Sequence, residues 1–179
     1  MDVLLKNKTL FLRAPEPEDL DVLYKWENDT DVWRYGSAIS PYSKYALKQY
    51  IAEAETDIFQ SKQLRFMIVL QKAKTTVGTI DLYDFDALNS RCGVGVYIDP
   101  EWRKKGYANA ALSLLENYSF SFLKINQLYA IIPQNNEDSL RLFRNSGFSQ
   151  SGVLKQWIST ESAYKDAFIV QKLNSNYYE

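Results

Sequence analysis

Residues 93–112 read GVGVYIDPEWRKKGYANAAL, a stretch that joins a strand to a helix through a basic turn. The strand-like run is residues 93–98, and the Asp99-Pro100 pair ends it. Helical spacing of apolar residues then runs over residues 107–122. The fold is therefore expected to be organised around this strand, this turn and this helix.

The turn itself has the features of an anion site. Gly106 lets the backbone pass close to a ligand because it has no Cβ. The first N–H groups of the following helix lack intrahelical partners, and the helix dipole places partial positive charge there. Arg103, Lys104 and Lys105 stand beside them. The segment predicts a pyrophosphate site, although a basic surface turn that merely opens a helix is the alternative. It matches neither the GxxxxGK[ST] loop nor the GxGxxG fingerprint.

The other elements follow from hydrophobic periodicity. Further strands are expected at residues 9–13, 65–70, 75–83, 128–132, 153–158 and 163–170. Further helices are expected at residues 17–29, 43–59 and 138–146, with Ser43 as an N-cap and Gly147 after the last helix. Connections are expected at residues 32–41, 71–74, 84–90 and 159–162. The order β-α-α-β-β-β-α-β-α-β-β predicts a mixed α/β (α+β) sandwich around one sheet, not a doubly wound fold.

Composition narrows the chemistry. A chain of 179 residues without repeats or linkers suits one domain, residues 1–179. The net charge of −1 disfavours a nucleic-acid binder. There is no histidine, which excludes a Ser-His-Asp triad and histidine-ligated zinc, so no metal is expected. The sequence shows no secretory signal and no apolar run long enough to span a membrane, so a cytoplasmic protein is expected.

A second segment, PQNNEDSLRLFRNSGF, occupies residues 133–148. Asn136 suits either the N-cap of a short helix or a bond to ligand amides. Phe143 on the apolar face of that helix suits the core.

With both segments in view, the chain resembles the GCN5-related N-acetyltransferases (GNAT). Residues 103–108, RKKGYA, match that family's [RQ]-x-x-G-x-[GA] coenzyme A loop. Residues 136–148 resemble its N-x-x-S-x-x-L-[YF]-x-x-x-G-F segment. The order of the motifs and elements agrees over nearly the whole chain. Within the family the chain is most similar to the branch of spermidine/spermine and ribosomal-protein N-terminal acetyltransferases.

The resemblance implies a three-layer sandwich with a central sheet splayed at the acetyl-CoA strand. It implies transfer of an acetyl group from acetyl-CoA to a primary amine by direct attack. The backbone of Val96, Tyr97 and Ile98 would bind the pantetheine arm, Asn136 would contact it, and Ser139 and Phe143 would lie near it. The residues expected to hold the pyrophosphate through backbone N–H groups are Arg103, Lys104, Lys105, Gly106, Tyr107, Ala108 and Asn109.

One departure from the family concerns the general acid. Many relatives carry a tyrosine at the position of Phe143, and its phenol is thought to protonate the departing thiolate. Phenylalanine cannot donate that proton, so water, a neighbouring tyrosine or the substrate ammonium must do so, or the enzyme is slower. General acid catalysis is typically worth about 10²–10⁴-fold, so its loss slows a reaction without forbidding it.

The base is expected to be a carboxylate acting through water. Asp81 and Asp84 are the candidates, and they align with acidic positions of polyamine-acetylating relatives. Asp81 is preferred because it lies within the strand-like run. The alternative is a solvated loop at the end of a strand.

The acceptor stays open at the level of sequence. Acidic residues at Glu27, Asp29 and Asp31 suit a polyamine. An aromatic cleft built from Trp33, Tyr35 and Tyr42 suits a peptide N-terminus or an aromatic amine, and each of these rings equally suits a core. Trp33, Tyr35 and Asp84 are the predicted substrate contacts. A homo-oligomer is also compatible with the sequence.

The competing hypothesis from another class is a non-catalytic acyl-CoA-binding regulatory module that kept the fold and lost the acid at Phe143.

Overall fold

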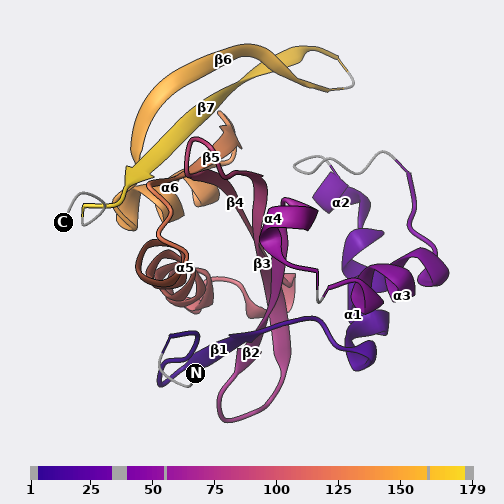
Figure 1. The fold of residues 1–179 in the computed structure, drawn as a ribbon. Coiled ribbons are helices and arrows are strands. Elements are labelled where there is room, and N and C mark those ends of the chain that lie inside the picture. Colours follow the sequence, from indigo (N-terminus) through magenta and orange to yellow (C-terminus); the bar gives the residue numbers. More distant parts are fainter. Residues whose placement is uncertain (1–3, 34–39, 55, 161, 176–179) are drawn as a thin grey trace. The chain divides into compact units, whose positions relative to one another are not determined.

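A computed structural model describes residues 4–33, 40–54, 56–160 and 162–175. The chain divides into two compact units. The larger contains Met1–Arg13 and Asp57–Glu179, and the smaller is Ala14–Thr56. Figure 1 traces both along the sequence.

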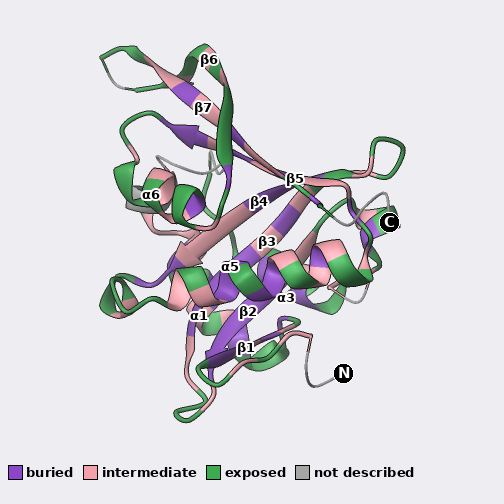
Figure 2. Ribbon diagram, turned by 90° about the vertical axis from the view of Figure 1, so that its left-hand side faces the viewer, coloured by how far each residue is buried: buried purple, intermediate pink, exposed green. Residues whose placement is uncertain are grey.

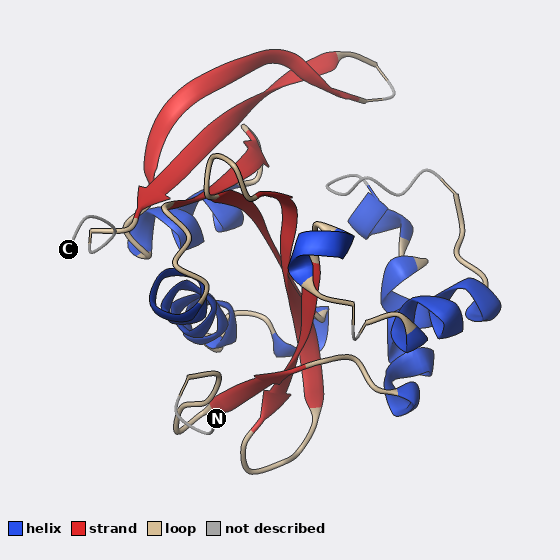
Figure 3. Cartoon of the chain, in the orientation of Figure 1, coloured by secondary structure: helices blue, strands red, loops and turns tan. Residues whose placement is uncertain are grey.

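The described residues of the larger unit form a seven-stranded mixed sheet in the order β1-β2-β3-β4-β5-β7-β6. Its strands are β1 (Leu10–Arg13), β2 (Leu64–Leu70), β3 (Thr76–Asp86), β4 (Arg91–Ile98), β5 (Gln127–Pro133), β6 (Ser149–Ser159) and β7 (Tyr164–Leu173). Neighbouring strands pair antiparallel except β4 and β5, which pair parallel. Strands β6 and β7 form a long hairpin at one edge (Figure 3).

Helix α5 (Tyr107–Asn117) covers the centre of one sheet face and continues into a π-helical turn, Tyr118–Phe122. Its buried side faces the sheet (Figure 2). Leu112 and Leu115 are fully buried in the same cluster as Ile80 and Leu82 of β3. Such leucines typically contribute about 2–5 kcal/mol each to stability. The helix, and therefore its N-terminus, is fixed against β3 and β4 by this core.

Helix α6 (Glu137–Asn145) is amphipathic, and it buries Phe143 in that cluster as well. Gly147 follows it with φ +87°, which is the left-handed ending expected from the sequence. Lys172 of β7 ties the two helices together. Its Nζ lies 2.6 Å from Oε2 of Glu116 on α5 and 2.7 Å from the Ser146 carbonyl oxygen at the end of α6.

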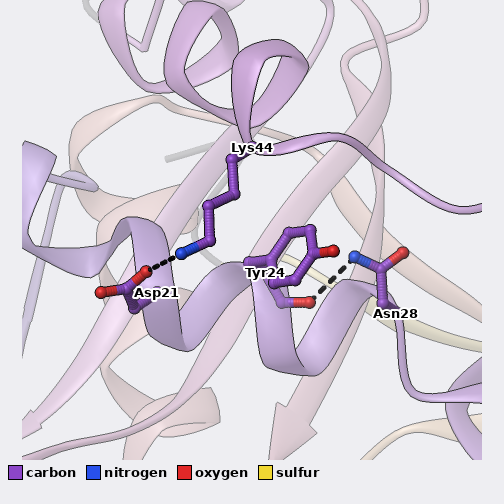
Figure 4. A network of polar contacts seen from close by, with 4 residues as sticks. All are labelled: Asp21, Tyr24, Asn28 and Lys44. Carbon is purple, nitrogen blue, oxygen red and sulfur yellow. Dashed lines mark hydrogen bonds and ion pairs between the residues drawn. The ribbon is translucent and has the colours of Figure 1, made fainter.

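The smaller unit is helical, with a short 3-10 turn at Pro17–Asp19, α1 (Leu20–Glu27), α2 (Thr30–Trp33) and α3 (Lys44–Ala52). Ser43 caps α3 as predicted, since its Oγ accepts a 3.0 Å bond from the Ala46 N–H. Helices α1 and α3 contact each other. Lys44 pairs with Asp21 at 2.6 Å (Figure 4), an exposed pair that contributes little to stability.

An asparagine side chain anchors the chain that leads into α3. The amide nitrogen of Asn28 donates to the carbonyl oxygens of Tyr24 and Tyr42, both at 3.0 Å. The first of these bonds is drawn in Figure 4. The Asn28 Oδ1 also accepts from the Tyr42 N–H at 2.8 Å, so residue 42 is held by its backbone.

Several predicted boundaries are wrong. Residues 43–59 do not form one helix, because the Asp57 carboxylate accepts from the N–H groups of Phe59 and Gln60 and so starts a separate short helix, α4 (Ile58–Ser61). The predicted loop 84–90 begins late, because the buried Phe85 extends β3 to Asp86. Helix α2 was not predicted and overlaps the predicted connection at residues 32–41, and β6 begins at Ser149 instead of residue 153. The order of the other predicted elements is confirmed.

Candidate active site

The sheet splits between β4 and β5. Their parallel ladder contains the pairs Arg91↔Gln127, Cys92↔Leu128 and Gly93↔Tyr129, while β4 continues to Ile98 and β5 to Pro133. We call the gap beyond Gly93 and Tyr129 the fork. Each strand keeps a partner on its outer side, β3 for β4 and β7 for β5. The inner edges therefore offer backbone groups to an extended ligand that adds as a strand.

The hydrogen-bond alternation of β4 identifies which amides face the fork. The Asp99 N–H donates to the Val77 carbonyl on the β3 side at 2.9 Å. Antiparallel pairing alternates, so the N–H of Tyr97 also faces β3. The N–H groups of Val94, Val96 and Ile98 therefore face the fork. Two of the three predicted pantetheine contacts lie on this edge, and the backbone of Tyr97 is turned away from it.

The N-terminus of α5 lies next to the outer end of β4. Gly106 is the N-cap with φ +81°, no side chain caps the helix, and a Cβ built at Gly106 would meet no protein atom within 4 Å. The first intrahelical bond there runs from the Ala110 N–H to the Gly106 carbonyl. The N–H groups of Tyr107, Ala108 and Asn109 thus point out of an open helix end, which is the geometry of an anion site.

The predicted cations play different parts in this turn. The Nε of Arg103 donates to the Ile98 carbonyl at 2.9 Å. Lys105 Nζ donates to the Glu101 carbonyl at 3.1 Å and lies 4.5 Å from the centre of the Trp102 ring. Lys104 is exposed with φ +60°. Arg103 and Lys105 therefore hold the turn against the end of β4, which presents the backbone N–H groups in a fixed position.

Asn136 and Phe143 take the structural positions that the sequence analysis gave as alternatives, a helix N-cap and a core residue. The Oδ1 of Asn136 accepts from the Ser139 N–H at 3.2 Å, so Asn136 caps α6 at the end of β5. Phe143 is buried at 3% exposure and meets Phe148 edge to face at 4.9 Å. Its ring belongs to the core and offers no proton.

Asp81 lies on β3, in register with Arg65 of β2 and Gly95 of β4. Arg65 binds both carboxylate oxygens, through Nε at 2.8 Å and Nη2 at 3.0 Å. The carboxylate is about a quarter exposed, with 24% of the side chain accessible. An ideal Cβ at Gly95 would lie 3.9 Å from Oδ2. Asp81 therefore stands over β4 close to the fork, orientated by its arginine.

Asp84 does not join Asp81. It is exposed, has φ +49°, and sits where the β3–β4 register shifts after Tyr83. Two residues lie between Asp81 and Asp84, so their Cα atoms are three steps, or about 10 Å, apart along an extended strand.

A tyrosine that the sequence interpretation missed stands at the fork. Tyr83 pairs with Gly93, and its ring lies edge to face with Tyr129 at 6.1 Å. Burial, with a contribution from Asp84 among other neighbours, raises the pKa of Tyr83 to about 12. Burial also raises the pKa of Tyr129. The sequence could have indicated Tyr83, because side chains alternate along a strand and residues 81 and 83 therefore lie on the same face.

The predicted acceptor residues of the smaller unit are only partly described. The Nε1 of Trp33 donates to the Glu27 carbonyl at 2.6 Å, and Tyr42 is 41% exposed. Tyr35 lies outside the described residues, as does the side chain of Asp31.

Among the described residues, no group of three or more histidine, cysteine, aspartate or glutamate side chains could hold a metal ion. In the same part of the chain, no helix combines the length and apolar character needed to cross a bilayer.

Comparison with known proteins places this geometry in a family. Residues 9–149 match the family described as Acetyltransferase (GNAT) domain. The chain is 28% identical over 156 residues to the spermidine N(1)-acetyltransferase of Escherichia coli K12, covering 87% of this chain and 81% of that one. It is 25% identical over 174 residues to the uncharacterized N-acetyltransferase p20 of Bacillus licheniformis, covering 97% of each.

Among solved structures, the fold is similar to that of spermidine N-acetyltransferase from Vibrio cholerae in complex with CoA and spermine. The TM-score is 0.84 at 24% identity, covering 97% of this chain and all of that one. The chain belongs to the GNAT acetyltransferase family. It is an N-acetyltransferase, and acetyl-CoA is the cosubstrate from which it moves the acetyl group to an amine.

Proposed function

We propose that the fork and the N-terminus of α5 together form the acetyl-CoA site of one acetyltransferase domain spanning residues 1–179. The observation that carries this is the early end of the β4–β5 ladder at Gly93↔Tyr129, five residues before β4 ends. The unpaired edge leads directly to an open helix end. An extended arm with a pyrophosphate at one end fits both features.

The arm would bind the N–H groups of Val94, Val96 and Ile98. The pyrophosphate would bind those of Tyr107, Ala108 and Asn109, with the exposed Lys104 adding charge. Asn136 caps α6 and would contribute its amide nitrogen to the arm, with Ser139 beside it. These residues hold and orientate the cosubstrate, which supplies the activated acetyl group.

The amine reaches the enzyme as an ammonium and must lose a proton before it attacks. We assign this to Asp81, through a water molecule. Asp81 is partly exposed, stands over Gly95 at the fork and has lone pairs beyond those that Arg65 occupies. A chain of ordered water that bypasses Asp81 is the alternative.

For the acceptor we propose a small polyamine, with a peptide α-amine as the second candidate. The related enzymes from Escherichia coli and Vibrio cholerae are named for spermidine. Asp84 adds an exposed negative charge to β3, and Asp81, whose charge Arg65 balances, keeps lone pairs that can accept from an ammonium; both features favour a cationic amine. The aromatic residues Trp33 and Tyr42 favour the peptide instead. We also propose a homo-oligomer, since a Vibrio cholerae neighbour is described as dodecameric. We further propose a cytoplasmic location.

The test measures coenzyme A release from acetyl-CoA with spermidine, spermine and a peptide bearing a free N-terminus. Asp81→Asn is compared with Asp166→Asn, which removes a carboxylate paired with Lys155 at 2.7 Å on the β6–β7 hairpin. We expect turnover with spermidine that falls only in Asp81→Asn. Turnover with the peptide alone would reject the polyamine, and equal rates in both variants would reject Asp81 as the base.

A further inference from the structure

The ring of Tyr83 lies across β4 rather than beside it. An ideal Cβ at Gly93 would come within 2.4–2.8 Å of three Tyr83 ring atoms, so only glycine leaves room for the ring there. The hydroxyl reaches toward β5, where the Ile131 backbone N–H is close enough to lower the pKa of Tyr83 in opposition to burial. Ile131 lies two residues beyond Tyr129, the last residue of the β4–β5 ladder. A β3 side chain thus places its hydroxyl at the apex of the fork.

The position of the sulfur follows from the order of groups in acetyl-CoA, and this step rests on the site proposed above. The pyrophosphate end lies at the N-terminus of α5, beside Ile98. The arm then runs back along the inner edge of β4 toward Val94, and five extended residues span about 16 Å. The thioester is at the far end of the arm, so it arrives at the apex where Tyr83 stands.

We propose that the Tyr83 hydroxyl donates a hydrogen bond to the sulfur of the departing thiolate, the interaction that Phe143 cannot supply. The amine nitrogen attacks the carbonyl carbon, and a C–N bond forms. The C–S bond then breaks, and its electron pair goes to sulfur. The ammonium proton has left through water to Asp81 and solvent before the attack, and the second proton that the nitrogen loses as the C–N bond forms follows the same route. The thiolate leaves hydrogen-bonded to Tyr83 and takes its own proton from solvent.

Tyr83 acts as a fixed donor that keeps its proton. The ring is held between Gly93 and Tyr129, which fixes the position of the hydroxyl. Burial raises the pKa of Tyr83 to about 12, whereas an ordinary thiol has a pKa of about 8.5. Full transfer of the phenol proton to the thiolate is therefore uphill, while a hydrogen bond to the developing charge is favourable.

The experiment compares Tyr83→Phe with Tyr129→Phe, which removes a hydroxyl from the ring packed against Tyr83. A hydrogen bond to a charged group is typically worth about 1.5–3 kcal/mol, so we expect kcat to fall about 10- to 100-fold in Tyr83→Phe. KM for acetyl-CoA and the melting temperature should stay near the wild-type values. Tyr129→Phe should keep wild-type kcat.

A second readout needs no turnover. The ultraviolet absorbance of the thiolate reports the pKa of the thiol in enzyme-bound CoA, with a CoA analogue lacking sulfur as the blank. If Tyr83 donates to sulfur, the thiol pKa is higher in Tyr83→Phe than in wild type by about one unit or more, and Tyr129→Phe leaves it unchanged. Gly93→Ala, which displaces the ring but keeps the hydroxyl, should reproduce the Tyr83→Phe result even if Tyr83→Phe folds poorly.

The outcomes separate this inference from the site on which it rests. Unchanged kcat and thiol pKa in Tyr83→Phe, with wild-type CoA affinity, would overturn the role of Tyr83 and leave the site intact. Lower CoA affinity without a change in the bound thiol pKa would make Tyr83 a structural residue. A wild-type protein that fails to bind CoA would instead reject the site itself.

Discussion

A single methyl group at the helix N-terminus should distinguish the proposed pyrophosphate site from a surface turn. Gly106 has φ +81° and Gly147 has φ +87°, so Gly106→Ala and Gly147→Ala strain the backbone alike. An L-residue in this region costs about 1–2 kcal/mol. For a chain of this size that lowers the melting temperature by about 2–4 °C per kcal/mol in either variant.

Binding of CoA should separate the two variants. A Cβ at Gly106 meets no protein atom within 4 Å, so its methyl group enters the space in front of the helix. At Gly147 the Cβ makes ordinary contact with Lys172, 3.6 Å away. Blocking one charge-assisted hydrogen bond to phosphate costs about 1.5–3 kcal/mol, or about 10- to 100-fold in Kd.

Isothermal titration with CoA measures Kd, and thermal melting measures the strain. We expect similar melting temperatures for the two variants and weaker binding in Gly106→Ala alone. Equal CoA affinity in both would refute the reasoning, because it would mean that the open helix end does not hold the phosphates.

Four shorter predictions follow from the same contacts. Asp81→Asn should lower kcat for spermidine by about 10²–10⁴-fold with little change in CoA affinity, measured in steady-state assays beside Asp166→Asn. Phe143→Tyr should lower the melting temperature without raising kcat, because it buries a hydroxyl in the Phe148 contact; a faster variant would show that this position still reaches the thioester. Burial raises the pKa of Cys92 to about 12, so iodoacetamide should modify it only after unfolding, and rapid native labelling would contradict its burial. The pKa of the Tyr83 phenol is about 10 in the unfolded chain and about 12 in the folded protein, so the unfolded chain loses this proton at lower pH. The contribution of Tyr83 to the free energy of unfolding is therefore complete below pH 10 and is lost as the pH rises toward 12. Urea titrations should show a smaller loss of stability over this pH range in Tyr83→Phe.

Much of the fold could be predicted because its signals are local. The alternation in residues 93–98, the Asp99-Pro100 stop and the glycine at the start of α5 all act within a few residues of the features they specify. The same holds for the side chain of Ser43, which caps the start of α3, and for the backbone conformation of Gly147, which ends α6.

The incorrectly predicted element boundaries are set by tertiary contacts or by local hydrogen bonds that compete with the helical pattern. Helical spacing of apolar residues extends past residue 52, but the Asp57 side chain bonds the next N–H groups and starts a new helix. Polar residues around Phe85 indicate a loop. The strand continues there because Phe85 is buried and its N–H donates to the Lys62 carbonyl at 3.0 Å.

Most of what the sequence predicts of the proposed site is backbone. The turn and the edge of β4 follow from a motif, whereas Tyr83 depends on cross-strand register. Nothing in the sequence near residue 83 indicates that its ring crosses Gly93 and reaches toward Ile131. Asp81 was predicted, but its partner Arg65 lies on another strand and was not.

Amide hydrogen exchange with and without CoA addresses the fork most directly, because it reads the backbone groups themselves. We predict that CoA slows exchange at Val94, Val96, Tyr107, Ala108 and Asn109, while Tyr97, which faces β3, changes little. Protection that appears elsewhere in the chain and leaves these amides exchanging at their free rates would contradict a cosubstrate held along the edge of β4.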